Sequence, residues 1–252
     1  METANYAKDE AAAREGHAEF TTTHWSLVVA AGETSSPRSV AAMEDLCRTY
    51  WYPLYAYVRR KGYSPEDAED LVQDFFARFL ERHYLANADP GRGKFRSFLL
   101  TSLQHFLVNE WRKSRAQKRG GGAFFEGWDE NQTEHRYLAE HAEAYTPEML
   151  FEKRWALALL DQVLLRLRAE FAAAGKEAQF EHLRLVLWGD KTDLSYAELA
   201  VRAGLTEGAL KVAVHRMRQR YRDLLRAEVA KTVASRVEVD EELRHLISMV
   251  SS

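Results

Sequence analysis

SYAELAVRAGLTEGALKVAVHRMRQRYRDLLR, residues 195–226, is the stretch that decides the fold of this 252-residue chain. Its second half repeats apolar residues at steps of four, three, four and three, the spacing of one buried face of an α-helix. These residues are Leu210, Val214, Met217, Tyr221 and Leu224. A shorter helix over 196–202 precedes it, and Ser195 and Glu198 stand at the two positions of a capping box. The pattern predicts a helix-turn-helix.

Three small or polar residues support this prediction. Ala200 allows two helices to cross closely, Gly204 suits a left-handed turn, and Thr206 can cap the second helix. The basic positions of the second helix are Lys211, His215, Arg216, Arg218, Arg220 and Arg222. A basic amphipathic helix alone is equally typical of a solvated surface, but the turn and the caps favour a helix that binds DNA.

Charge is segregated along the chain. The formal net charge is only −3, but basic residues gather in 92–119 and 211–226, and acidic residues gather in 64–81 and 126–152. Such segregation suits a protein that meets an anionic polymer on one side and a different partner on another.

Several classes of protein are disfavoured. The N-terminus lacks the order of a signal peptide and no long uncharged apolar run occurs, so we expect a cytoplasmic protein without membrane contact. Cys47 is the single cysteine, which excludes an internal disulfide and a zinc cluster built on cysteines. We find no phosphate-binding loop, HExxH or GxSxG motif, and no ligand spacing among the histidines. We therefore expect no enzymatic activity, no cofactor and no metal.

Helical spacing continues through the rest of the chain, and no segment alternates as a strand would. Ser64 and Pro65 give a strong start signal to one helix, and Pro53 is expected to kink or divide the helix before it. We predict an all-α protein with two helical domains joined by an acidic, Gly-rich linker. The expected divisions are an N-terminal extension (1–40), a first helical domain (41–119), the linker (120–147), a helix-turn-helix domain (148–229) and an acidic amphipathic tail (230–252).

Two motifs together resemble a known family. DAEDLVQDFFARFL (67–80), followed by GKFRSFLLTSLQHFLVNEWRKSRAQKR (93–119), is similar to the second conserved region of bacterial sigma factors of the extracytoplasmic-function (ECF) type. SYAELAVRAGLTEGALKVAVHRMRQRYRDLL is similar to their fourth region. The similarity covers roughly residues 41–119 and 151–228, in the family's order with a linker between. Either motif alone is suggestive, and the ordered pair is specific.

The resemblance implies that the first domain contacts core RNA polymerase and minus-10 promoter DNA. The residues implied in polymerase binding are Glu69, Asp70, Gln73 and Asp74. An exposed stripe of these residues suits a partner that presents arginines, although it is also typical of a solvated face. The residues implied at the minus-10 element are Lys94, Arg96, Gln104, His105, Asn109, Trp111, Arg112, Lys113 and Arg115. Trp111 either stacks on an unpaired base or belongs to the core, whereas Phe106 is expected in the core.

The resemblance also implies that the second domain binds duplex DNA at the minus-35 element. Recognition of bases would rest on Thr206, Lys211, Val212, His215 and Arg216, while Arg218 and Arg222 would hold phosphates. The chain departs from the family pattern at two places. It has His105 and Phe106 where Arg and Asn are frequent, and Val212 and Ala213 follow Lys211 where Ser and Arg are frequent. Promoter specificity is therefore not carried over.

Two functions follow as alternatives. The first is an ECF-type sigma factor that binds core RNA polymerase, recognises promoter DNA and promotes initiation, with an anti-sigma factor or another regulator as a further partner. The second is a helix-turn-helix regulator that acts without joining the polymerase, which leaves the acidic helix unexplained. We also expect the tail to fold back on the second domain or to bind a regulator, through its acidic face and its apolar residues. These apolar residues are Val239, Leu243, Leu246 and Ile247.

Overall fold

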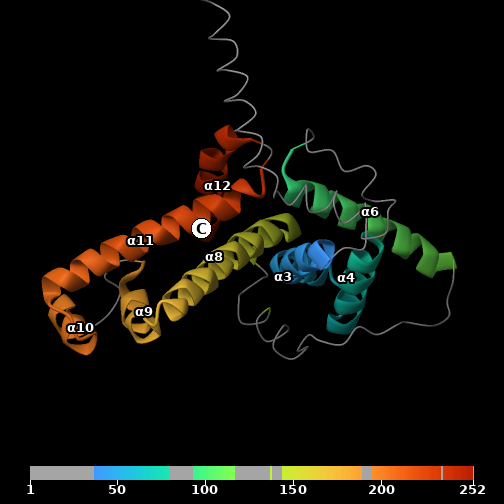
Figure 1. Ribbon diagram of the computed structural model, residues 1–252. Coiled ribbons are helices and arrows are strands. Elements are labelled where there is room, and N and C mark those ends of the chain that lie inside the picture. Colours follow the sequence, from blue (N-terminus) through green and yellow to red (C-terminus); the bar gives the residue numbers. More distant parts are fainter. Residues whose placement is uncertain are drawn as a thin grey trace, which may run out of the picture. The chain divides into compact units, whose positions relative to one another are not determined.

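The protein is helical throughout the described part of the chain. The computed structural model describes residues 37–79, 93–116, 137, 144–188, 194–233 and 235–251, and these contain helices and no strand (Figure 1). The α-helices are α3 (Pro37–Arg60), α4 (Pro65–Phe79), α6 (Phe95–Ala116), α8 (Pro147–Ala173), α9 (Glu177–Leu183), α10 (Tyr196–Arg202), α11 (Glu207–Ala230) and α12 (Val239–Ser251). Two short 3₁₀ helices are η3 (Arg184–Val186) and η4 (Arg236–Glu238). The predicted all-α class is confirmed. None of the described helices is long and apolar enough to cross a bilayer.

The chain divides into two compact units. Unit 1 comprises Met1–Ala158 and Val229–Ser252, and unit 2 comprises Leu159–Glu228. The boundaries fall inside α8 and α11, so the first turns of α8 and the whole of α12 belong to unit 1. Most of the predicted N-terminal extension and nearly all of the predicted linker lie outside the described residues.

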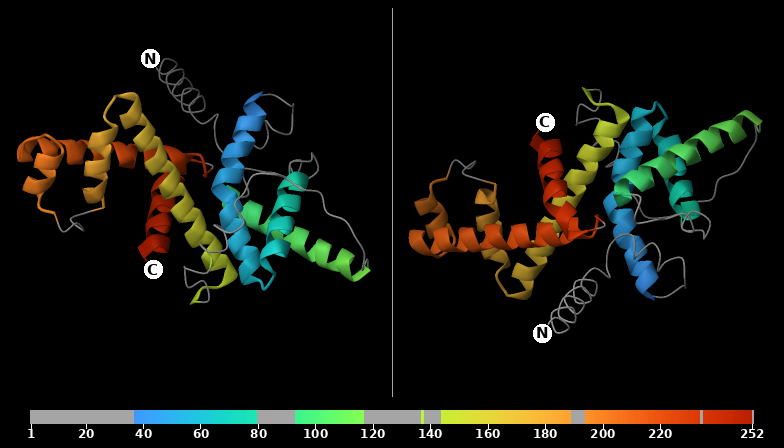
Figure 2. Two further views of the ribbon diagram at one scale, coloured as in Figure 1. Left: turned by 90° about the horizontal axis from the view of Figure 1, so that it is seen from below. Right: turned by 90° about the horizontal axis from the view of Figure 1, so that it is seen from above.

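Unit 1 has an aromatic core built by α3, α4 and α6, which lie together in both views of Figure 2. The ring centroids of Phe75 and Phe79 on α4 are 5.4 Å apart, and the Phe106 ring on α6 is 5.7 Å from that of Phe75. Phe106 is buried, as the sequence predicts. Clustered rings of this kind bury a large apolar area and pack edge to face. This core holds α6 in place from Phe95 to Leu107.

The residues that begin and end the helices around α3 and α4 adopt largely the expected local structure. Ser64 Oγ accepts a hydrogen bond from the Asp67 backbone N–H at 3.1 Å and so caps α4. Gly62 has φ of 97°, a left-handed conformation that glycine adopts readily at the end of a helix. Of the two predicted effects of Pro53, a kink or a division, the division does not occur, because Pro53 lies inside α3, which continues to Arg60.

The apolar face of α11 packs into the core of unit 2. All five residues of the stripe predicted from the sequence are buried: Leu210, Val214, Met217, Tyr221 and Leu224. Phe180 and Leu183 of α9 and Leu199 of α10 are also buried in this unit. The opposite side of α11 is therefore the side available to a partner.

Candidate nucleic-acid interface and acidic helix face

The helix-turn-helix forms with the caps that the sequence predicts. The Glu198 backbone N–H donates to Ser195 Oγ at 3.2 Å, and the Ser195 backbone N–H donates to Glu198 Oε2 at 2.8 Å. The hydrogen bond from the Ser195 backbone holds the pKa of Glu198 below its usual value. Gly204 makes the turn with φ of 66°, and Thr206 Oγ1 accepts from the Ala209 backbone N–H at 3.2 Å. These bonds fix the angle at which α11 begins.

The outer face of α11 presents a mixed basic and apolar surface. Its exposed residues from the predicted set are Thr206, Lys211, Val212, His215, Arg216 and Arg222. Lys211 Nζ lies 2.6 Å from Glu207 Oε1 one turn earlier, a weak exposed pair that a phosphate can replace. The first turns of α11 thus combine groups that recognise base edges with groups that hold phosphates.

Arg218 does not belong to this exposed face. Its Nη2 and Nε donate to the backbone carbonyls of Val186 and Leu187, at 2.5 and 3.2 Å. These carbonyls end η3 and have no further turn of helix to accept from. The predicted role of Arg218 in holding phosphates is therefore not supported by its position, because its guanidinium is already used within unit 2.

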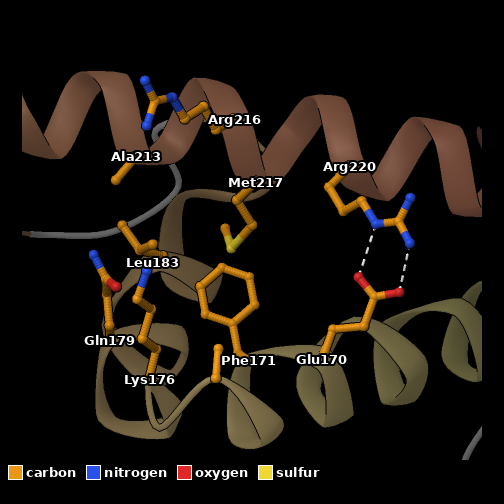
Figure 3. Close-up of a pocket in the computed structure, with 10 residues that line it drawn as sticks. Glu170, Phe171, Lys176, Gln179, Leu183, Ala213, Arg216, Met217 and Arg220 are labelled. Carbon is orange, nitrogen blue, oxygen red and sulfur yellow. Dashed lines mark hydrogen bonds and ion pairs between the residues drawn. The ribbon is translucent and has the colours of Figure 1, made fainter.

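Arg220 is likewise engaged within unit 2. Figure 3 shows its guanidinium reaching Glu170 of α8, with two hydrogen bonds of 2.6 and 2.7 Å. The hydrogen bond from Arg220 lowers the pKa of Glu170. Arg216, one turn earlier, points away from Glu170 in the same view. Sequence spacing did not separate these two arginines, because the partner carboxylate lies on another helix.

The cap on α11 leads to a testable prediction. Replacing Thr206→Ala removes the acceptor of the Ala209 N–H, and is expected to lower the free energy of unfolding by about 1 kcal/mol. The matched variant Thr206→Ser keeps the hydroxyl and should retain most of that stability. The unfolding free energies of both variants are measured by denaturant titration, with circular dichroism as the signal. Equal stability of the two variants would show that the hydroxyl does not cap α11.

The second half of α6 gathers most of the predicted minus-10 residues on its surface. The exposed ones are His105, Asn109, Trp111, Arg112 and Lys113. Trp111 is 52% exposed, so it is a surface residue rather than part of the core. Gln104 is half-buried and donates to Tyr57 Oη at 2.9 Å. The Arg115 side chain lies outside the described residues.

Glu110 holds the exposed part of α6 against α4. Its Oε1 accepts from Lys113 Nζ at 2.9 Å and also from Arg78 Nη1 of α4. Burial alone would raise the pKa of Glu110, but these two hydrogen bonds hold it below the usual value. Arg78 also lies over the Phe106 ring, 5.2 Å from its centroid. Sequence reasoning missed Arg78, although its spacing of four from Asp74 is a signal for an ion pair on a helix.

Lys94 and Arg96, at the start of α6, do not join this exposed group. Arg96 is 3% exposed, lies 4.3 Å above the centre of the Trp155 ring, and donates from Nε to Glu152 Oε2 at 2.6 Å. Lys94 Nζ lies 2.7 Å from Glu242 Oε2 of α12. The structure therefore divides the predicted minus-10 residues into an exposed set and a paired set.

The acidic face of α4 differs from the predicted stripe in one residue. Asp70 and Asp74 are exposed and Gln73 is half-buried, but Glu69 is only 7% exposed. The expectation that Glu69 is exposed is wrong, because steps of three and seven residues place it above the buried residues Val72 and Phe76. Glu66 and Asp67 are exposed instead. We call the exposed carboxylates the acidic patch; they are Glu66, Asp67, Asp70 and Asp74.

Comparisons with known proteins agree with this architecture. A family model described as Sigma-70 region 2 matches residues 41–117. The ECF RNA polymerase sigma factor SigE of Mycolicibacterium smegmatis is 26% identical over 202 residues, which cover 80% of this chain and 68% of SigE. The RNA polymerase sigma factor YlaC of Bacillus subtilis is 26% identical over 178 residues, which cover 70% of this chain and 88% of YlaC. No solved structure matches the chain significantly.

A sigma-70 region 2 that precedes a helix-turn-helix supports the assignment of this chain to the sigma factors, a class of transcription initiation factors. The two relatives are both sigma factors, and the similarity to the ECF sigma factor SigE supports the ECF type. The resemblance noted from the sequence is confirmed on this point. The alternative of a helix-turn-helix regulator outside this family is not favoured.

Proposed function

We propose that this chain is a dissociable promoter-specificity subunit that joins core RNA polymerase and directs it to promoter DNA. The observation that carries the proposal is the exposed group on α6, where a tryptophan and basic side chains lie within the residues matched by Sigma-70 region 2. The chain itself catalyses no reaction in this role. An anti-sigma factor or another regulator remains a predicted partner.

The exposed half of α6 is suited to DNA whose strands have separated. Trp111 offers an indole face to an unpaired base, and stacking of this kind contributes about 1–3 kcal/mol per base. Asn109 provides both a donor and an acceptor to a base edge, while Arg112 and Lys113 supply charges to the adjoining phosphates. The combination favours minus-10 DNA over an intact duplex, in which bases are stacked.

The exposed face of α11 is suited to the major groove of a duplex. Lys211, His215 and Arg216 can donate to base edges, and the 50%-exposed Val212 can contact a thymine methyl group. Thr206 and Arg222 flank these residues and suit the phosphate backbone. We assign this face to upstream promoter DNA.

The acidic patch of α4 is suited to the polymerase. Carboxylates that share one exposed face attract a partner presenting arginines, which form paired hydrogen bonds to them. The phosphates of DNA would be repelled by the same negative charges, so the patch does not serve DNA. It therefore gives the protein a second, chemically different surface.

Co-elution tests the proposal directly. The purified full chain is mixed with bacterial core RNA polymerase and passed over a size-exclusion column, and the two are expected to elute together. The assembled complex should also bind a duplex with a premelted segment more tightly than the chain alone does. A chain that binds duplex DNA but elutes apart from the polymerase would contradict the proposal, and would favour a free-standing regulator.

A further inference from the structure

The C-terminal helix α12 is attached to unit 1 by a buried carboxylate. Glu242 is 0% exposed, its Oε2 lies 2.7 Å from Lys94 Nζ, and its Oε1 contacts Arg96 Nη1. Burial of a carboxylate is strongly unfavourable unless cations compensate its charge. Both compensating cations belong to the start of α6. The C-terminal helix thus contacts the start of the helix that carries the exposed minus-10 group.

A second polar link lies beside the first. His245, one turn after Glu242, places Nε2 3.0 Å from Glu152 Oε2, and the same oxygen accepts from Arg96 Nε. Val239 and Leu246 bury the apolar side of α12. We call this set of five charged and polar residues the tail cluster: Lys94, Arg96, Glu152, Glu242 and His245. It explains why α12 belongs to unit 1. Of the two alternatives predicted for the tail, folding back on the second domain or binding a regulator, the first is therefore wrong.

Docking of α12 reverses the charge presented near the start of α6. Lys94 and Arg96 alone would extend the basic surface of α6 toward its N-terminal end, where helix geometry also favours an anion. The first turn of α12 brings the Glu242 carboxylate to this place, and Glu241 also lies near enough to act electrostatically on Lys94. Burial lowers the pKa of Lys94, with the nearby Arg96 adding to the effect, so the site favours a compensating anion.

We propose that α12 competes with promoter DNA for Lys94 and Arg96. Glu242 holds the two cations in the free protein, and a phosphate of the DNA strand lying along α6 replaces its carboxylate when the promoter binds. Glu242 then returns to water and α12 leaves unit 1. This inference rests on the proposed function, because it requires DNA along α6. It makes the tail an intramolecular inhibitor that weakens binding of the free sigma factor to DNA.

Neutralising Glu242 tests the competition. The full chain and its Glu242→Gln variant are titrated against a fluorescent single-stranded oligonucleotide at low salt, and the variant is expected to bind about three- to tenfold more tightly. The matched control Asp240→Asn removes the same charge from an exposed position of α12, and should change affinity less than twofold. Adding Lys94→Gln to Glu242→Gln should abolish the gain. Unchanged or weaker binding by a folded Glu242→Gln variant would overturn the proposal.

Hydrogen exchange on the native chain provides a test that needs no variant. Because coupling between two binding events is reciprocal, DNA that displaces α12 must loosen it. Amide exchange over 239–251 is therefore expected to accelerate when the oligonucleotide is added. Exchange that stays slow while DNA is bound would show that α12 is a permanent part of unit 1, and would leave the sigma-factor function intact. Absence of oligonucleotide binding by the native chain and its variants, both free and with polymerase, would instead overturn the proposed function.

Discussion

Reversing two carboxylates of the acidic patch, Asp70→Arg and Asp74→Arg, is expected to weaken binding to core RNA polymerase about a hundredfold or more. Like charges placed against each other at an interface cost several kcal/mol, and about 2.7 kcal/mol corresponds to a hundredfold change in affinity. Both side chains are exposed, so the substitutions leave the aromatic core of unit 1 untouched. Co-elution with polymerase and competition for it against the native chain measure the loss.

The fold of the variant should survive because α4 is attached to α6 independently of Asp74. Arg78 reaches Asp74 at 3.4 Å but also binds Glu110 and lies over the Phe106 ring. Exposed pairs such as Asp74 with Arg78 contribute little, typically about 0–1 kcal/mol. Circular dichroism and thermal unfolding should therefore remain near those of the native chain.

A matched control separates the position of the charge from its amount. Glu44→Arg reverses an exposed carboxylate on α3, outside the acidic patch, and is compared with the single variant Asp70→Arg. We expect the Glu44 variant to bind polymerase nearly as the native chain does, and the Asp70 variant to bind at least tenfold more weakly. Equal losses would mean that overall charge, and not the patch, governs association.

Local sequence signals anticipated the helices because those signals act over a few residues. The stripe of α11, the capping box at Ser195 and the left-handed Gly204 all depend on neighbours within one or two turns. They therefore remained valid when the chain folded. At Pro53, where a kink or a division was predicted, α3 is not divided, since packing of α3 in the core outweighs the local penalty of a proline inside a helix.

The candidate site was harder to anticipate because burial and pairing depend on distant parts of the chain. Arg96 looks like a surface cation in sequence, but Trp155, Glu152 and Glu242 come from two other helices to surround it. Glu69 shares a helix with exposed carboxylates, yet the pitch of α4 turns it toward the core. Charge alone does not reveal which residues of a basic or acidic segment remain available to a partner.

Arg216 and Arg218 provide the sharpest test of that distinction, because they stand two residues apart on α11. Arg216→Ala is expected to weaken duplex binding by about ten- to a hundredfold, the usual effect of removing an arginine that contacts a base edge. The unfolding free energy should change little, since the side chain is exposed. Fluorescence anisotropy with a duplex selected by the native chain from random sequences measures the affinity.

Arg218→Ala is expected to show the opposite pattern. Removing its guanidinium leaves the Val186 and Leu187 carbonyls without their donor, which should lower the unfolding free energy by about 1–3 kcal/mol. The folded protein should bind the duplex with nearly native affinity and nearly native salt dependence, because no phosphate contact is lost. A stable Arg218→Ala protein with a salt slope reduced by about one would instead restore Arg218 as a phosphate contact. In that case its two bonds to η3 would have to break when DNA binds, and α11 would reach DNA with a wider basic face than the free protein presents.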